Sequence, residues 1–271
     1  MTAAAPPAGR PRPRQPPVSW GGRLRLSLAA VAAAALTLWS ARAVGFSAHE
    51  LLTNLDKIGR LLDDSFPPDW SFWPRLVAPF VETLQIAVIG TVAGSLIALP
   101  LAVLAARPVS PARPVYYAGR NLMNVLRTMP DLFWAMLFAS AVGFGPFAGA
   151  LALTVFTVAV VSKLLSESIE AIDLGLLEAV RASGGGWWET VRFSVLPQVL
   201  PQYVSYALYA FEINVRASTV LGLVGAGGIG MVLNTQRTTF EYSRVTLIVL
   251  VIFAIVLVIE QVSEAARRRL V

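Results

Sequence analysis

Six long apolar runs constrain this chain more than any other feature. A helix needs about 20 residues to cross about 30 Å of hydrocarbon, and these runs reach or approach that length. Backbone groups in lipid must be paired within the structure, and no strand-like alternation competes with helices here. Only 14% of the residues are charged, against about a quarter in soluble domains. The sequence therefore predicts an all-α polytopic membrane protein with spans at Leu24–Val44, Val77–Ala106, Asn121–Gly143, Ala148–Leu165, Leu200–Leu221 and Val245–Val262.

The distribution of arginine residues orients these spans. If the N-terminus lies in the cytoplasm, most arginines of the two tails and of the second and fourth connections fall inside, as the positive-inside rule requires. We therefore expect a multi-pass protein of a bacterial cytoplasmic membrane with both termini in the cytoplasm. The expected segments are a disordered cytoplasmic tail (1–23), a first transmembrane helix (24–44), an extracytoplasmic segment (45–76), a core (77–262) with a polar cytoplasmic insert (166–199), and a basic cytoplasmic tail (263–271).

The first apolar run has two interpretations. Arg23 and Arg25 precede it, and Ala41-Arg42-Ala43 at its end resembles the cleavage site of a signal peptide. The run is nevertheless long enough to span a membrane, and the tail before it is long for a signal. We favour a retained span, and the topology of the later spans is the same under either interpretation.

Residue types that carry catalysis or metal binding are nearly absent. The chain has no Cys and a single His, His49, so we expect neither a disulfide framework nor a metal site. No G-x-x-x-x-G-K-[ST] loop occurs, so this chain should not hydrolyse ATP. Much of the positive charge lies at span ends and in the tails, which argues against nucleic-acid binding. We expect no enzymatic activity, no catalytic residues and no cofactor in this chain.

The cytoplasmic insert has the local signals of two short helices. Asp173 is a suitable N-cap for a helix that runs to Ser183, and three glycines from Gly184 can end it. A second helical segment, Trp187–Leu196, then leads into the next span at Pro197. Trp187 and Trp188 are of the residue type that anchors interfaces. The alternative is that the two rings only sit at headgroup level.

The insert also carries a signature. Glu178-Ala-Val-Arg-Ala-Ser-Gly184 and Leu196-Pro197 resemble the cytoplasmic motif of binding-protein-dependent ABC importer permeases, in which Glu178, Ala179, Gly184, Leu196 and Pro197 occupy the motif positions. Val180 and Ser194 depart from it. Within the core, Arg127–Trp134, Gly143–Gly149 and Phe211–Gly230 resemble phosphonate importer permeases, a likeness that covers residues 77–262.

The resemblance implies the transmembrane subunit of a type I ABC importer that moves phosphonate or a related phosphorus oxyanion. It implies a second permease subunit, for which we expect an identical copy. Two cytoplasmic ATPase subunits, which hold ATP and Mg²⁺, would couple through residues 173–197. An extracytoplasmic binding protein would deliver the substrate. The alternatives are a secondary transporter driven by an ion gradient, for which no convincing inverted repeat is visible, and a membrane enzyme, which would need a catalytic cluster.

Several polar residues inside the spans are candidates for the substrate path. Glu212 and Arg216 lie four residues apart on one helix face, with Asn214 between them. Charges in a membrane usually line a cavity or pair with each other, so this pair either contacts the anion or locks the helix. Arg127 and Asp131, which flank a proline, pose the same choice. We interpret Glu167 and Glu170 as ordinary charges of the cytoplasmic face.

A glycine-rich segment follows the fifth span. Its pattern, Gly225-Ala-Gly-Gly-Ile-Gly230, fits the dinucleotide-binding fingerprint, but that fingerprint requires a strand before it and a helix after it. We therefore reject nucleotide binding. We expect Gly225, Gly227, Gly228 and Gly230 to form a gate or a closely packed backbone near the outer face, with a plain turn as the alternative.

Overall fold

The computed structural model describes residues 20–269, so most of the disordered tail predicted for 1–23 lies outside the described residues. The chain divides into two compact units, residues 1–59 and 60–271. The first unit contains α1 (Trp20–Ala43), α2 (Ala48–Thr53) and the first half of α3 (Leu55–Ser65). α1 buries none of the residues of its apolar stretch, Leu24–Ala43, inside the protein. Such a helix is stable when lipid covers its side chains.

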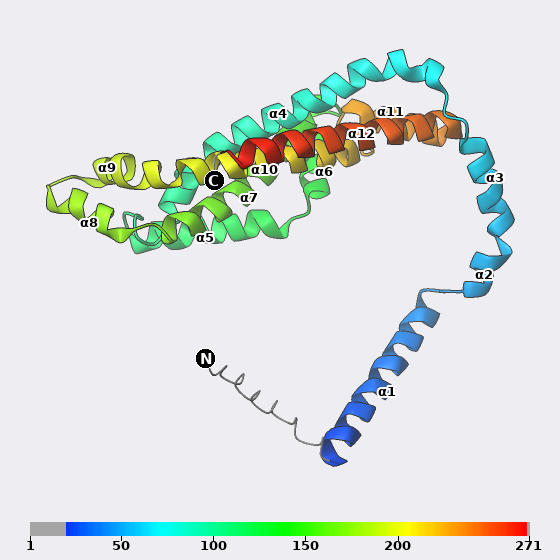
Figure 1. Ribbon diagram of the computed structural model, residues 1–271, viewed down its shortest axis with the longest axis horizontal. Helices are drawn as coiled ribbons and strands as arrows, with labels where there is room; N and C mark the ends of the chain where they lie inside the picture. The colour runs from blue at the N-terminus through cyan, green and yellow to red at the C-terminus, as the bar shows by residue number, and fades with distance from the viewer. Residues whose placement is uncertain (1–19, 270–271) are drawn as a thin grey trace, which may run out of the picture. The chain divides into compact units, whose positions relative to one another are not determined.

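Three helices form the core of the second unit. They are α4 (Trp73–Leu104), α7 (Pro146–Glu170) and α10 (Leu196–Gly222), and Figure 1 shows them side by side. Small residues allow the closest approach: a Cβ atom added at Gly90 of α4 would lie 2.6 Å from the Cβ of Leu153 on α7. Close backbone contact through glycine replaces the hydrophobic effect as the source of helix association in lipid.

The third predicted span, residues 121–143, is broken at Pro130, and its first helix begins before residue 121. Two helices, α5 (Arg113–Thr128) and α6 (Asp131–Val142), meet there at a bend of 89°. The break falls at Met129 and Pro130, which have extended backbone angles. Proline disfavours helical geometry at the residue before it, which explains the position of the break.

The remaining helices complete the two ends of the bundle. The insert contains α8 (Leu174–Ala182), α9 (Trp187–Thr190) and a π-helical turn (Val191–Val195), and it extends beyond the core at one end (Figure 1). A short turn, η1 (Trp70–Phe72), precedes α4. α11 (Gly228–Thr238) and α12 (Tyr242–Arg267) follow α10. α12 therefore continues through residues that we expected to belong to the basic tail at 263–271.

Four of the described helices are long and apolar enough to cross a membrane, and the bent pair of α5 and α6 makes a fifth candidate. The four are α1, α4 with its preceding turn, α7 and α12. α10, which corresponds to the fifth predicted span, has 27 residues and is therefore long enough as well. It carries the polar residues Glu212, Asn214 and Arg216.

Candidate functional site

The insert between α7 and α10 begins and ends as its local chemistry predicts. The side chain of Asp173 accepts a hydrogen bond of 2.9 Å from the backbone N–H of Gly175, which satisfies one of the free donors at the start of α8. At the other end, Gly184 has a φ of +87°, a conformation that glycine adopts without a steric penalty. The N–H groups of Gly184 and Gly185 bond back to the last turn of α8.

α8 turns one face inward and leaves the signature residues outside. Leu177 is buried, whereas Glu178 and Ala179 are exposed. Gly184 is also exposed, and a Cβ atom there would meet nothing within 4 Å. The side of α8 that carries Glu178 and Ala179 is therefore accessible to a partner. Pro197 is exposed as well, and Leu196 is half-buried against the core.

The two tryptophans of the insert play different parts, which the sequence alone left undecided. Trp187 packs against a buried cluster and donates a hydrogen bond of 2.6 Å from Nε1 to the carbonyl oxygen of Val109. Arg181 donates to the neighbouring carbonyl of Pro108 at 3.0 Å. Trp188 is 73% exposed. Trp187 thus attaches the insert to the loop after α4, and of the two tryptophans Trp188 is the one that presents its ring to a partner.

Glu212 forms a buried ion-pair network rather than an open site. Its carboxylate accepts hydrogen bonds from Arg216 and, at 3.2 Å, from both terminal nitrogens of Arg267 at the end of α12. The Glu212 side chain is 7% exposed, whereas that of Arg216 is 48% exposed. The pairing expected between Glu212 and Arg216 is present. Arg267 is a partner that sequence reasoning missed, because we assigned it to a tail.

Asn214 is fully buried and joins the three core helices. Its Nδ2 atom donates hydrogen bonds of 2.8 Å to Thr91 Oγ1 on α4 and to Thr157 Oγ1 on α7. Its Oδ1 atom has no partner among the described residues. In this conformation Asn214 lines no open path, and its amide fixes the spacing of α4, α7 and α10.

Arg127 and Asp131 are not paired in the structure. Asp131 accepts a hydrogen bond of 3.0 Å from the N–H of Leu132 at the start of α6. Arg127 is exposed and lines a cavity of about 460 Å³ with Lys163 of α7 and Tyr209 of α10. Sequence reasoning missed Lys163, although a lysine within an apolar span is the kind of residue that marks a functional cavity.

The two acidic residues that we interpreted as ordinary surface charges have specific basic partners. Glu167 lies 2.8 Å from the Nζ atom of Lys163. Glu170 accepts a hydrogen bond of 2.8 Å from Arg120 and one of 3.1 Å from the backbone N–H of Arg107. The inner half of α7 therefore presents a row of charges toward α5.

The glycine-rich segment forms a closely packed contact between α10, α11 and α4. Gly225, Gly227 and Gly228 all have positive φ angles. The N–H of Gly228 donates to Glu82 Oε1 at 3.3 Å, and the N–H of Ile229 donates to Thr83 Oγ1 at 2.8 Å. α4 thus caps the start of α11. A Cβ atom at Gly230 would overlap the backbone of α10.

Comparisons with known proteins agree on one family. Residues 98–271 match the family described as binding-protein-dependent transport system inner membrane component. The phosphate-import permease protein PhnE of Mycolicibacterium smegmatis is 39% identical over 237 residues, which are 88% of this chain and 42% of that protein. This chain therefore spans less than half of that relative. The phosphite transport system permease protein PtxC of Stutzerimonas stutzeri is 39% identical over 82% of this chain and 80% of its own length.

Solved structures show the same architecture. An inward-facing structure of the MetNI methionine ABC transporter superposes with a TM-score of 0.66 at 25% identity, over 75% of this chain and 99% of that one. An amino acid ABC transporter gives a TM-score of 0.61 at 20% identity, over 73% and 95% of the two chains. The fold is therefore the all-α polytopic fold of type I ABC importer permeases.

Proposed function

Because this chain belongs to the family of binding-protein-dependent transport system inner membrane components, we propose that it is the transmembrane subunit of an ATP-driven importer of phosphonate or a related phosphorus oxyanion. The names of the two similar relatives, which specify phosphate and phosphite, support this substrate class. The family also favours an ATP-driven importer over a secondary transporter.

One observation carries the mechanism: the signature residues of α8 are exposed on an insert that is attached firmly to the core. The partners that we infer are a second copy of this chain, two cytoplasmic ATPase subunits that hold ATP and Mg²⁺, and an extracytoplasmic binding protein. The ATPases would contact the face of α8 that carries Glu178 and Ala179. This arrangement requires both termini to lie in the cytoplasm.

The insert can transmit motion because it connects two core helices directly. α7 continues to Glu170, just before α8, and α10 begins at Leu196, just after the π-helical turn. The hydrogen bond from Trp187 and the one from Arg181 also attach the insert to the loop after α4. A displacement of α8 by the ATPases would therefore move α4, α7 and α10 together. Such rigid-body movement of helices alternates the access to a path between two subunits.

Reconstitution tests the proposed function. The chain, its ATPase and its binding protein are placed in proteoliposomes, and uptake of labelled 2-aminoethylphosphonate, phosphite and phosphate is measured with and without internal ATP. ATP-dependent uptake of at least one of them is expected. Uptake that ignores ATP and follows an ion gradient would instead establish the secondary transporter.

Variants of the insert test the coupling. Glu178→Arg or Gly184→Val should abolish uptake and weaken co-purification of the ATPase, while the amount of inserted protein stays the same. Asp63→Arg reverses an exposed carboxylate on α3 and serves as the matched control, so it should retain the ATPase. Normal uptake by both insert variants would refute the assignment of α8.

A further inference from the structure

One face of α5 is polar along its whole length. Arg113, Tyr117, Arg120, Asn124 and Arg127 follow each other at alternating steps of four and three residues, which places them on one side of a helix. All five side chains are exposed or half-buried. At 1.5 Å per residue, Arg113 and Arg127 lie about 21 Å apart along the helix axis. We call this set the α5 stripe.

A cationic cavity lies beside the core at the Arg127 end of the α5 stripe. The cavity of about 460 Å³ is lined by four polar residues, Arg127, Lys163, Glu167 and Tyr209, and by four apolar residues of α7 and α10. Glu167 pairs with Lys163 at 2.8 Å, and Arg127 has no ion-pair partner in the described part of the chain. Two cations thus face one carboxylate. The net positive charge favours an anion, and the volume lies in the range of small-molecule sites.

The middle of the stripe is neutralised. Arg120 forms an ion pair of 2.8 Å with Glu170, and both side chains are about one quarter exposed. The guanidinium group also lies over the ring of Tyr116, 5.4 Å from its centroid. An anion that passes here meets weaker attraction than at Arg127. Passage of an ion requires a stretch of weaker attraction between its binding sites, because a site that binds too tightly does not release its ion.

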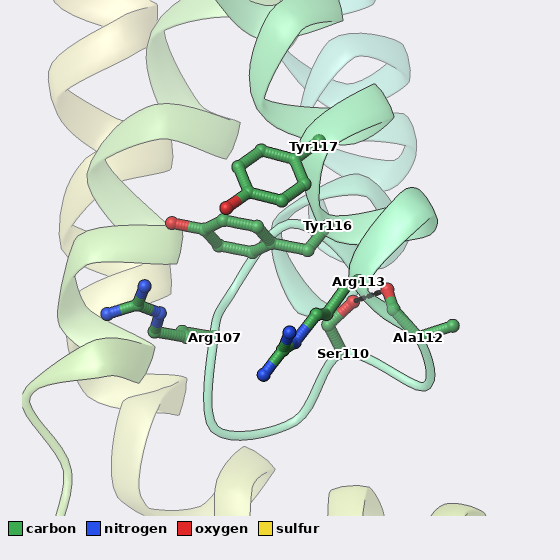
Figure 2. A pocket seen from close by; sticks show the side chains of 6 residues that line it. All are labelled: Arg107, Ser110, Ala112, Arg113, Tyr116 and Tyr117. Carbon is green, nitrogen blue, oxygen red and sulfur yellow. Dashed lines mark hydrogen bonds between the residues drawn. The ribbon is translucent and has the colours of Figure 1, made fainter.

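A second cavity, of about 490 Å³, lies at the Arg113 end of the α5 stripe. It is lined by Arg107, Ser110, Arg113, Tyr116 and Tyr117. No acidic residue lines it. Figure 2 shows the guanidinium groups of Arg107 and Arg113 on the same side of the two tyrosine rings, with both phenol hydroxyls directed toward the side where Arg107 lies. Neither guanidinium group has an ion-pair partner among residues 20–269. Guanidinium and phenol groups are donors suited to the oxygens of a phosphoryl group.

We propose that the α5 stripe forms the cytoplasmic half of the path for the phosphorus oxyanion, with an anion site at Arg127 and Lys163 and an exit site at Arg107 and Arg113. The inference rests on the proposed function. It keeps Arg127, which the sequence already made a candidate, and adds Lys163 and further residues of α5 to the path. Arg127 lies within the predicted third span, and an arginine there is costly unless it faces water or protein. The α5 stripe has one acidic partner, at its middle, and the proposal requires water to cover the rest.

Cysteine accessibility tests whether the stripe faces water, because the natural chain has no Cys. Asn124→Cys lies on the stripe, and Leu122→Cys lies on the other side of the same helix and is the matched control. Both are reacted with an anionic methanethiosulfonate in the complete transporter, with and without nucleotide trapping. Asn124→Cys should react about tenfold faster, since only an ionised thiol in water reacts, and phosphite should protect it. Equal rates at both positions, or no reaction at Asn124→Cys in either state, would overturn the proposal.

Charge removal tests the anion site itself. Arg127→Gln should raise KM for uptake about tenfold or more, the loss expected for one charge-assisted hydrogen bond, and Arg127→Lys should recover most of it. ATPase activity stimulated by the binding protein should persist in both variants. Arg268→Gln, at an exposed arginine directly after the end of α12, is the control and should leave KM unchanged. An unchanged KM in Arg127→Gln would refute the site.

The two proposals fail in different ways. If the wild-type complex takes up no phosphorus oxyanion, the proposed function itself is wrong. If the wild type transports and both α5 tests fail, only the stripe is wrong. The exit site contains the same donors that hold the phosphate of an anionic lipid. Modification at Asn124 that depends on anionic lipid and not on phosphite would assign the stripe to lipid, which would also overturn the path.

Discussion

The contact between α4 and α7 is close enough that one methyl group at Gly90 should push the helices apart. An added Cβ atom would lie 2.6 Å from Leu153 Cβ and 3.3 Å from the carbonyl carbon of the same residue. Non-bonded carbons rest about 3.5 to 4.0 Å apart, so the helices must separate by about 1 Å. Both atoms belong to or adjoin the backbone of α7, and Leu153 is fully buried. No flexible side chain can therefore absorb the added group.

The cost of Gly90→Ala follows from two terms. Overpacking of a dense core costs about 1 to 3 kcal/mol, and the rigid neighbours here favour the upper half of that range. Separation also stretches the hydrogen bonds from Asn214 to Thr91 and Thr157, and a bond between membrane helices contributes about 0.6 kcal/mol. Stretching these bonds without breaking them adds only a small part of that amount, so overpacking dominates and we expect a loss of about 2 to 3 kcal/mol. For a protein of this size that is a fall in Tm of about 4 to 12 °C.

Thermal unfolding of the purified protein in detergent, followed by tryptophan fluorescence, measures this loss. Gly59→Ala is the matched control, because Gly59 lies in a helix and an added Cβ atom meets nothing within 4 Å. The control should be unchanged or more stable by up to about 1 kcal/mol. If Gly90→Ala unfolds at the same temperature as Gly59→Ala, the close approach of α4 and α7 is wrong, and with it the argument that small residues hold this core together.

Three further variants test separate contacts. Trp187→Phe keeps an aromatic ring but loses the hydrogen bond that attaches the insert to Val109. Because motion of the insert is then transmitted less completely, we expect more ATP to be hydrolysed per substrate imported, as measured in proteoliposomes. Glu212→Gln should lower the unfolding free energy by about 1 to 3 kcal/mol, since its two arginine partners lose a buried charge while remaining partly solvated; the Tm measures it. The hydrogen bond from Ser71, together with an arginine of α12, lowers the pKa of Asp69. That stabilisation is present above the pKa of the unfolded state and is lost as pH falls through the lower folded value, so Asp69→Asn should flatten the dependence of Tm on pH below about pH 4.

Short-range chemistry explains what the sequence could predict. The start of α8 depends on one side chain, Asp173, that bonds two residues ahead, and its end depends on glycine in a positive φ conformation at Gly184. The break at Pro130 was visible as a proline within an apolar run, although its angle was not. These features arise within a few residues, so a single sequence contains their cause.

Long-range contacts explain what it could not predict. Glu212 and Arg267 are separated by 55 residues, and Trp187 and Val109 by 78. Arg267 stands next to other arginines in a basic tail and carries no local sign of a buried partner. Whether Trp187 points inward depends on the loop after α4, which no periodicity in the insert describes. The sequence therefore predicted the local structure of the insert and left the long-range partners of its residues undetermined.

The same limit explains why sequence reasoning alone gave equal standing to the charges of α10 and to Arg127 and Asp131 as candidates for the path. Sequence spacing reveals pairs within one helix, such as Glu212 with Arg216, and we expected the substrate where such charges were most conspicuous. In the folded chain that carboxylate is already satisfied and buried, and a buried, satisfied charge has little left to offer a ligand. Arg127 has the opposite character, since it is exposed, faces a cavity and forms no ion pair with a carboxylate of residues 20–269. The residues best suited to carry an anion are therefore those that the fold leaves without an ionic partner, and a single sequence does not contain that information.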